Sequence, residues 1–425
     1  MEKRKEWILK AIYLLLAIPM FYYVSQDITL GGVGFMFRYL FGMAIVGLAL
    51  LRFLISPNMK RMVMTLRYAG ILCLPYLWTL LYSMVVWVLG YAPVKVMSRG
   101  FFFVIYEIIA VLAAGSALYL FGKKGVFLQL SALLAANAVY ILKVIRLNGA
   151  NAFFREYIRL IVTMTGDTGP IMKSFEVLGY SYALGLFLVY FFLNRRESEK
   201  YVGLAVLSTA CFLLGLKRSV LLAVVVACAA GIILNRMPGR FGRRISAAVC
   251  WIGIGAAVCY VAACSRGLFH WLEAMGINTN SRIDVLDYFR PYYEMSPGFL
   301  GHGAGFVSGM MASGELTVNV NGYIFGDIHN DFLRQYIELG AFGFCIWLWL
   351  FLNVRVKYFF HKEWSDLGCR HGILSFCFIL TVFVTFMTEN AYYHYYTTLS
   401  MSVMIMAFGY EQFEKETKIG GNEKT

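Results

Sequence analysis

Long apolar stretches alternate with short polar connections along the whole chain. A backbone in lipid has to satisfy its hydrogen bonds within each segment, and a helix of about 20 apolar residues spans a bilayer. The pattern therefore predicts an all-α polytopic transmembrane bundle of about twelve helices. The apolar stretches are residues 7–24, 33–55, 68–90, 97–121, 125–145, 177–193, 201–216, 219–234, 245–264, 328–352, 371–390 and 391–410.

The connections differ in charge, and this difference predicts the orientation of the chain. Lys and Arg are retained on the cytoplasmic side of a membrane. With the N-terminus in the cytoplasm, the basic clusters fall on that side: Arg52 with Lys60 and Arg61, Lys123 with Lys124, Arg195 with Arg196 and Lys200, residues 236–244, residues 355–370, and the C-terminal tail. We therefore expect both termini in the cytoplasm.

This topology divides the chain into four parts. We expect residues 1–264 to hold the first nine helices and residues 328–410 to hold the last three. Between them, residues 265–327 form a large extracytoplasmic loop, and residues 411–425 form a cytoplasmic tail. A long loop inside a compact protein usually carries function.

Composition excludes a soluble globular protein. Hydrophobic residues make up 60% of the 425 residues, charged residues make up 15%, and the mean hydropathy is +0.66. The net charge of +14 does not indicate nucleic-acid binding, because the basic residues lie in short clusters between apolar runs. We interpret this charge as a signal of membrane topology.

The cysteines and histidines give no metal-binding pattern. The nine cysteines are scattered singly, without a CxxC pair. His270, His302 and His394 are expected on the outer side, but their spacing fits no zinc motif. We expect neither a metal nor a cofactor.

One outer segment, residues 146–176, predicts a helix with two possible positions. Its aromatic and aliphatic residues are interleaved with arginines, as in a helix that lies in the membrane interface. A helix packed on the bundle fits equally well. The residues concerned are Phe153, Phe154, Tyr157, Ile158 and Ile161, with Arg155 and Arg159.

The most informative pattern runs from residue 281 to residue 343. It begins with an Arg-containing turn, Ser281 to Asp284, and continues with a glycine-rich segment, Gly301 to Gly305. The sequence HN-x-x-L-x-x-x-x-E-x-G-x-x-G then starts at His329 and enters a transmembrane helix. This combination resembles the bacterial O-antigen ligase and O-antigen polymerase superfamily.

The resemblance implies a glycosyltransferase of the bacterial inner membrane. Such an enzyme acts on the outer face and takes its glycan from undecaprenyl diphosphate, with no nucleotide sugar. By the resemblance, His329 activates the acceptor hydroxyl, and Arg282 and Arg218 hold the donor diphosphate, with Arg290 in reserve. The implied partners are the lipid-linked glycan, membrane lipid, a chain-length regulator and a flippase, and no nucleic acid.

Elementary chemistry supports cations at this position. A lipid diphosphate gains negative charge as the glycosidic bond breaks, and fixed guanidinium groups stabilise that charge. Lys217 and Arg218 fall at the outer membrane boundary, although they also fit a snorkelling pair. Arg282 alternatively forms a salt bridge with Asp284 or Asp287.

The sequence also suggests how His329 acts. It falls at the outer end of a helix between Asp327 and Asp331. A neutral imidazole takes a proton from a sugar hydroxyl, and a neighbouring carboxylate orients the ring. A capping or surface histidine is the alternative. Asn330 and the more distant His302 are candidate supporting residues.

Three other polar features have weaker functional signals. Glu338 lies on nearly the opposite side of its helix from His329, so we expect it mainly to pair within the bundle, with a supporting role as the alternative. Glu107 is an ionisable group inside a span and is either functional or part of a structural ion pair. The aromatic run at residues 392–396 fits an interfacial belt or a surface that stacks on sugar rings.

Three functions remain open from the sequence. The first is a polymerase that moves a growing glycan onto another lipid-linked repeat unit, as in O-antigen, capsule or exopolysaccharide synthesis. The second is a ligase that transfers the glycan to lipid A core or another acceptor. The third is a transporter of polysaccharide or lipid-linked sugar, which the absence of an internal repeat disfavours.

Overall fold

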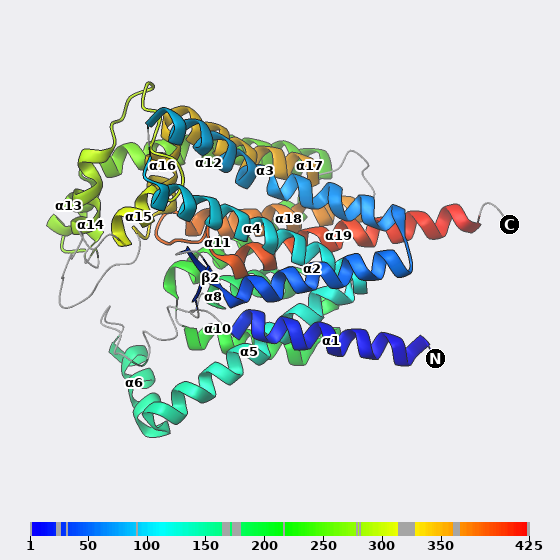
Figure 1. Cartoon of the computed structure of the whole chain (residues 1–425). Helices are drawn as coiled ribbons and strands as arrows, with labels where there is room; N and C mark the ends of the chain where they lie inside the picture. Colours follow the sequence, from blue (N-terminus) through cyan, green and yellow to red (C-terminus); the bar gives the residue numbers. More distant parts are fainter. Residues whose placement is uncertain are drawn as a thin grey trace.

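A computed structural model shows a bundle of long helices (Figure 1). It describes residues 2–22, 27–30, 33–90, 92–163, 171, 180–215, 217–277, 279, 282–312, 328–359 and 366–422. Each predicted apolar stretch overlaps a helix. Within the described residues, seven helices are long and apolar enough to cross a membrane, and three shorter apolar helices accompany them. The prediction of an all-α polytopic membrane protein is confirmed.

The helices of the bundle follow the chain in order. They are α1 (Glu2–Tyr22), α2 (Phe37–Ile55), α3 (Met59–Gly90), α4 (Val94–Phe121), α5 (Lys124–Asn148), α8 (Tyr180–Leu193), α10 (Val202–Gly215), α11 (Arg218–Asn235), α12 (Gly239–Ser265), α16 (Asp331–Leu348), α18 (Asp366–Thr385) and α19 (Tyr395–Asn422). A π-helix, η2 (Trp349–Val354), and α17 (Arg355–Phe359) continue α16.

Shorter elements gather at one end of the bundle, which we call the loop end. They are α6 (Ala150–Thr163), α13 (Leu268–Ala274), α14 (Arg282–Phe289), the 3-10 turn η1 (Arg290–Tyr292) and α15 (Phe306–Ala312). Both chain termini lie at the opposite end (Figure 1). The helix α9 (Arg195–Lys200) connects α8 and α10.

Several boundaries differ from the sequence prediction; α3, for example, begins at Met59 and not at residue 68, and α19 continues to Asn422 through the predicted tail. Residues 33–36 form the strand β2 (Val33–Met36), which pairs antiparallel with β1 (Asp27–Leu30), so α2 begins only at residue 37. The last two predicted spans meet at residue 390, whereas α18 ends at Thr385 and α19 begins at Tyr395. Residues 386–394 are therefore a non-helical connection.

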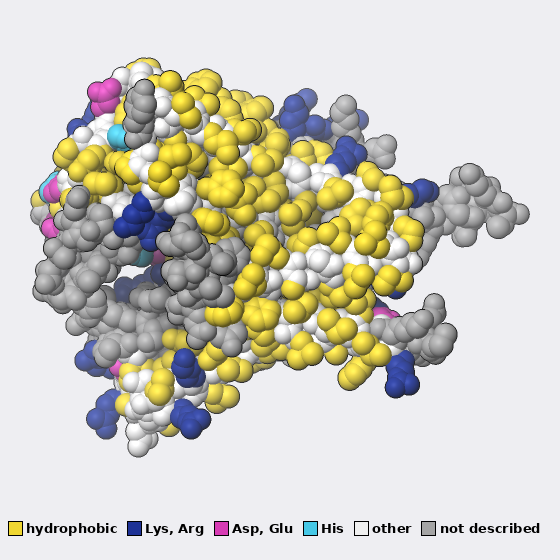
Figure 2. All heavy atoms as spheres, in the orientation of Figure 1, with side chains coloured by type: hydrophobic (Ala, Val, Ile, Leu, Met, Phe, Trp, Pro, Cys, Tyr) yellow, Lys and Arg dark blue, Asp and Glu magenta, His cyan; other side chains and the backbone are white. Residues whose placement is uncertain are grey.

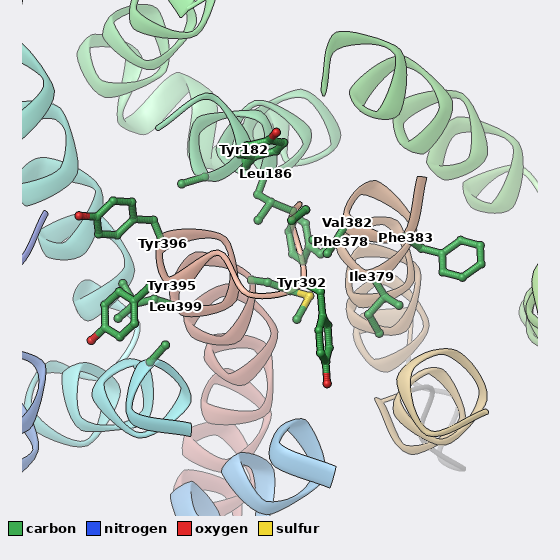
Figure 3. Close-up of a cluster of buried hydrophobic side chains, with 14 of the residues drawn as sticks. Tyr182, Leu186, Phe378, Ile379, Val382, Phe383, Tyr392, Tyr395, Tyr396 and Leu399 are labelled. Atoms are coloured by element: carbon green, nitrogen blue, oxygen red, sulfur yellow. The ribbon is translucent and has the colours of Figure 1, made fainter. Parts of the chain in front are cut away.

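The centre of the bundle is a layer of small and aromatic residues. α4 packs against α2, α3 and α19, and its buried face is rich in alanine, which lets the helices approach closely. Tyr182 and Leu186 of α8 lie in the same cluster as Phe378 of α18 and Tyr392 of the connection (Figure 3). Outside, apolar side chains form a broad belt, and Lys and Arg gather toward both ends (Figure 2).

The helix predicted within residues 146–176 is α6. Phe153 is buried in a small cluster with Val144 and Ile171, so one side of α6 packs on α5. Phe154 and Ile158 are exposed and lie one helical turn apart. The helix thus combines the two expected features, a packed side and an exposed apolar stripe.

The glycine-rich segment fills a break in α16. Gly340 has φ +62° and interrupts the helix. The carbonyls of Ile337 and Glu338 instead accept hydrogen bonds from the backbone amides of His302 and Gly303, at 3.1 and 2.7 Å. The loop backbone therefore replaces the missing helical hydrogen bonds.

The Glu338 side chain closes this junction. Its Oε1 accepts hydrogen bonds from the amides of Gly305 and Val307 at the start of α15, and it lies 3.6 Å from Arg334 Nε one turn earlier in α16. The expectation that Glu338 pairs within the bundle is confirmed. The close neighbours of Gly340 are backbone atoms of Phe299 and Leu300 in the loop, so this glycine makes room for the loop.

We predict that Gly340→Ala destabilises the protein by about 2 kcal/mol or more. The new Cβ lies 2.2 Å from the carbonyl oxygen of Phe299, and the positive φ strains any side chain. Gly255→Ala in α12 is the matched control, because no heavy atom lies within 4 Å of its Cβ. Thermal unfolding in detergent measures both. Equal melting temperatures for the two variants would contradict the prediction.

Candidate active site

A buried carboxylate at the loop end is surrounded by four side chains from three separate parts of the chain. Glu389 lies in the connection between α18 and α19 and is 6% exposed. Its Oε2 accepts hydrogen bonds from Tyr182 OH at 2.7 Å and Lys217 Nζ at 3.2 Å, and its Oε1 accepts one from Ser219 Oγ at 2.6 Å. His329 Nδ1 lies 3.8 Å from Oε2.

His329 is held in an unusual backbone conformation directly before α16. Its φ of +49° makes it the one non-glycine residue with positive φ in the described part of the chain. Such a conformation costs about 1 to 3 kcal/mol and persists where the surroundings fix it. Asn330 provides this restraint, because its Oδ1 caps the helix by accepting a hydrogen bond from the Leu333 amide at 3.1 Å.

The two nitrogen atoms of the His329 ring have different surroundings. Nδ1 points toward the Glu389 carboxylate, whereas 40% of the side chain is exposed to solvent. A carboxylate beside one ring nitrogen favours the tautomer with its proton there and leaves the lone pair on the other nitrogen. Figure 2 shows a hollow at the loop end in which Lys, Arg and His side chains are visible.

The surroundings of Glu389 keep it ionised. Burial raises the pKa of this carboxyl, but the combined effect of His329, Lys217, Ser219 and Tyr182 outweighs burial and holds the pKa well below its usual value. Glu389 is therefore a fixed negative charge at any physiological pH.

The two predicted cations before α11 take different positions. Lys217 is the N-cap residue of α11 and is directed at Glu389, with its ammonium 5.4 Å from the ring centroid of Tyr182. Arg218, the next residue, is exposed. Lys217 therefore forms part of the buried cluster, and Arg218 lies at its edge.

Arg282 reaches the same connection from α14. Its Nη2 donates a hydrogen bond of 3.0 Å to the carbonyl of Thr388, the residue before Glu389. The salt-bridge alternative with Asp287 does not describe the observed contacts, because Asp287 pairs with His270 at 3.0 Å. Arg282, Lys217 and His329 thus converge on residues 388–389.

Asp331 and Asn330 fix the connection in place. Asp331 is fully buried, and its Oδ2 accepts a hydrogen bond of 2.7 Å from the Tyr392 amide. Asn330 Nδ2 donates to Tyr260 OH at 3.3 Å, and that hydroxyl donates to the Met387 carbonyl at 2.7 Å. Asp327 lies outside the described residues.

The structure places other candidates away from Glu389. Arg290 donates to the Tyr293 carbonyl and lines a cavity of about 170 Å³ with Phe269, His270 and Asp287. His302 Nε2 lies 2.7 Å from the Tyr292 carbonyl oxygen, and its ring stacks on Phe306. Glu338 belongs to the α15–α16 junction described above.

The aromatic run at residues 392–396 is largely internal. Tyr392, Tyr395 and Tyr396 are each about 1% exposed or less, and Tyr392 stacks on Tyr76 of α3. The two surface roles considered from the sequence therefore do not describe these three residues.

Glu389 is the residue that sequence reasoning missed. It was assigned to a transmembrane stretch, so its position in a connection was hidden. The sequence does hold one sign of it. Glu389 is a lone carboxylate at the end of an apolar segment, and the predicted topology puts it on the same side of the membrane as the basic pair at residues 217 and 218. Among the described residues, no group of three or more His, Cys, Asp and Glu side chains is placed to hold a metal ion.

We predict that Glu389 makes stability depend on acidity. Its pKa is lower in the folded than in the unfolded chain, so the ionised form stabilises the fold above the usual carboxyl value of 4.5. This contribution is lost as the pH falls below that value toward the folded pKa. The melting temperature of the wild type should therefore fall more steeply from about pH 5 to about pH 3 than that of Glu389→Gln.

The control for this measurement is Glu294→Gln, an exposed carboxylate at the same end. Its curve should follow the wild type. At neutral pH, Glu389→Gln should lose about 3 kcal/mol, because Lys217 keeps a buried charge without its partner. Parallel curves for all three proteins would show that Glu389 has no coupled charge.

Comparison with known proteins bears on this arrangement. Residues 203–348 match a family model described as O-antigen ligase. This range runs from α10 to the end of α16 and includes Lys217, Arg282 and His329, but not Glu389. No curated protein and no solved structure matches the chain. The match confirms the resemblance seen at residues 281–343 and supports a glycosyl-transferring membrane protein. Residues 203–348 are therefore similar to the O-antigen ligase family.

Proposed function

We propose that this protein polymerises oligosaccharide repeat units linked to undecaprenyl diphosphate, on the outer face of the bacterial cytoplasmic membrane. The observation that carries the proposal is the convergence of His329, Lys217 and Arg282 on residues 388–389 at the loop end of the bundle. A base and several cations at one position suit a reaction that removes a proton and releases a diphosphate.

The proposed reaction is a single glycosyl transfer. His329 takes the proton of an acceptor sugar hydroxyl through Nε2, while Glu389 orients the ring and stabilises the imidazolium formed. The acceptor oxygen forms a bond to the anomeric carbon of the donor glycan. The bond from that carbon to the diphosphate oxygen breaks, and the leaving group is undecaprenyl diphosphate.

The cations act on the leaving group. Arg282 and Arg218 bind the diphosphate, whose charge grows as the bond breaks, so they stabilise the transition state more than the ground state. Lys217 keeps Glu389 in place and raises the positive potential beside it. Arg290 is the remaining candidate for the diphosphate, at the cavity beside α14.

A ligase is the second candidate, because the description of the matching family names that activity. Polymerase and ligase share the donor and the proposed site, and they differ in the acceptor. The test is purified protein with a single lipid-linked repeat unit as sole substrate. A ladder of products supports polymerisation, whereas transfer only after addition of lipid A core or another second acceptor supports ligation and rejects our proposal.

We predict that His329→Ala lowers the rate of polymer formation by about 100-fold or more, because the acceptor hydroxyl loses its base. His371→Ala is the matched control, since this histidine of α18 also lies 3.8 Å from a carboxylate, that of Glu411, far from the candidate site. It should keep most of the activity. Product ladders from equal amounts of folded protein measure both.

The location of the unused substrate in cells tests the transporter function as well. With His329→Ala, unpolymerised repeat units should remain accessible at the outer surface. Accumulation of those units inside the cell would favour transport over glycosyl transfer.

A further inference from the structure

Arg38, in the first turn of α2, is a cation without a carboxylate partner. Its Nη2 donates a hydrogen bond of 2.8 Å to Tyr39 OH, and its guanidinium lies 4.8 Å from the Tyr39 ring centroid. Its Nε is buried and has no hydrogen-bond partner. Within the described residues it forms no ion pair. The Arg38 side chain is partly buried, and the buried Glu107 acts on it electrostatically without an ion-pair contact. An anion from outside the chain would stabilise this cation further.

An aromatic wall joins Arg38 to the candidate active site. The Tyr396 ring lies 5.9 Å from the Arg38 guanidinium and 6.0 Å from the His394 ring. The ring centroids of His394 and Tyr182 lie 5.2 Å apart, and Lys217 Nζ lies 5.4 Å from the Tyr182 ring centroid. Arg38 therefore lies along one wall with the Glu389 cluster.

One more polar atom on this wall has no hydrogen-bond partner within the described residues. It is Nδ1 of His394, and it is buried. Burial, Arg38 and Lys217 together lower the pKa of His394 to about 3, so its ring is neutral. A neutral imidazole with a free ring nitrogen can donate a hydrogen bond to a ligand oxygen.

The charges along this wall do not balance. Arg38 and Lys217 are both cationic, and the neighbouring carboxylate Glu389 is already occupied by Lys217, Ser219 and Tyr182. A small anion with several acceptor oxygens would accept hydrogen bonds both from the guanidinium N–H groups of Arg38 and from the His394 ring. A phosphate group has this geometry and charge.

We propose that Arg38 and His394 bind one phosphate group of the polyprenyl diphosphate, in a subsite built from the N-terminal half of the bundle. The proposal rests on the function proposed above. It adds α2 and the start of α19 to a site that otherwise draws its cations from α11 and α14. The diphosphate then bridges Arg38 on one side and the Glu389 cluster on the other.

Direct lipid binding tests this subsite without requiring catalysis. The protein is placed in phosphatidylcholine nanodiscs, and the dissociation constant for undecaprenyl diphosphate is measured for the wild type, Arg38→Gln, Arg38→Lys and His394→Gln. Arg38→Gln should weaken binding by about 10- to 100-fold, the range for hydrogen bonds to a charged group. Arg38→Lys, which keeps the charge but loses the fork, should lie between the wild type and Arg38→Gln.

Arg266→Gln is the matched control. Arg266 is an exposed cation at the end of α12, so its removal changes the net charge by the same amount and should leave the dissociation constant within about twofold. The melting temperature of ligand-free Arg38→Gln should not fall, because a partly buried cation without an ion-pair contact has been removed. A lower melting temperature with unchanged lipid binding would show that Arg38 only packs on Tyr39 and would overturn the proposal.

Two further binding experiments identify the ligand and test this proposal independently of the proposed function. Nanodiscs of phosphatidylglycerol should not compete with undecaprenyl diphosphate; equal competition would mean that Arg38 binds ordinary lipid headgroups and would overturn the diphosphate assignment. His329→Ala should bind undecaprenyl diphosphate as the wild type does. If the wild type binds the lipid through Arg38 but makes no polymer, the subsite holds and the polymerase function fails.

Discussion

The site depends on one buried carboxylate. Glu389 is shared by side chains from α8, the start of α11 and the segment before α16, which are far apart in the sequence. An ionised carboxylate is stable inside a protein only when several donors and cations surround it. The same surroundings that keep it ionised position His329 and Lys217. The geometry of this candidate site therefore depends on the packing of the loop end.

A second junction holds the loop against this cluster. The backbone of residues 299–303 satisfies the groups exposed by the break at Gly340, and Glu338 caps the start of α15. In lipid, a broken helix is tolerated where other protein groups replace its hydrogen bonds. The glycine and glutamate motifs that suggested the family thus have a structural role. They fix α16, and its first residues carry His329 and Asn330 at the functional end.

The Glu389 cluster lies at one end of a long bundle. The centre of the bundle consists mainly of apolar and aromatic packing, and a second polar cluster, Lys123 with Glu197 and Glu411, lies at the opposite end. A lipid-linked substrate has an apolar tail and a charged head group that prefer different depths. A site of cations at the end of apolar helices matches that division, whereas alternating access normally requires polar groups near the midplane.

The sequence by itself determined the class of fold and suggested candidate residues for the site. Apolar length sets helices in lipid, and the pattern around His329 indicated the family and the cations Lys217, Arg218 and Arg282. The tertiary structure alone decided which carboxylate accompanies His329. Asp331 is adjacent in sequence but binds the Tyr392 amide, while Glu389, sixty residues away from His329, faces the ring. The physical reason is that a periodic apolar pattern specifies which segments are helices. It does not specify how their ends meet, because these contacts depend on bundle packing, on the break at Gly340 and on the non-helical connection at residues 386–394.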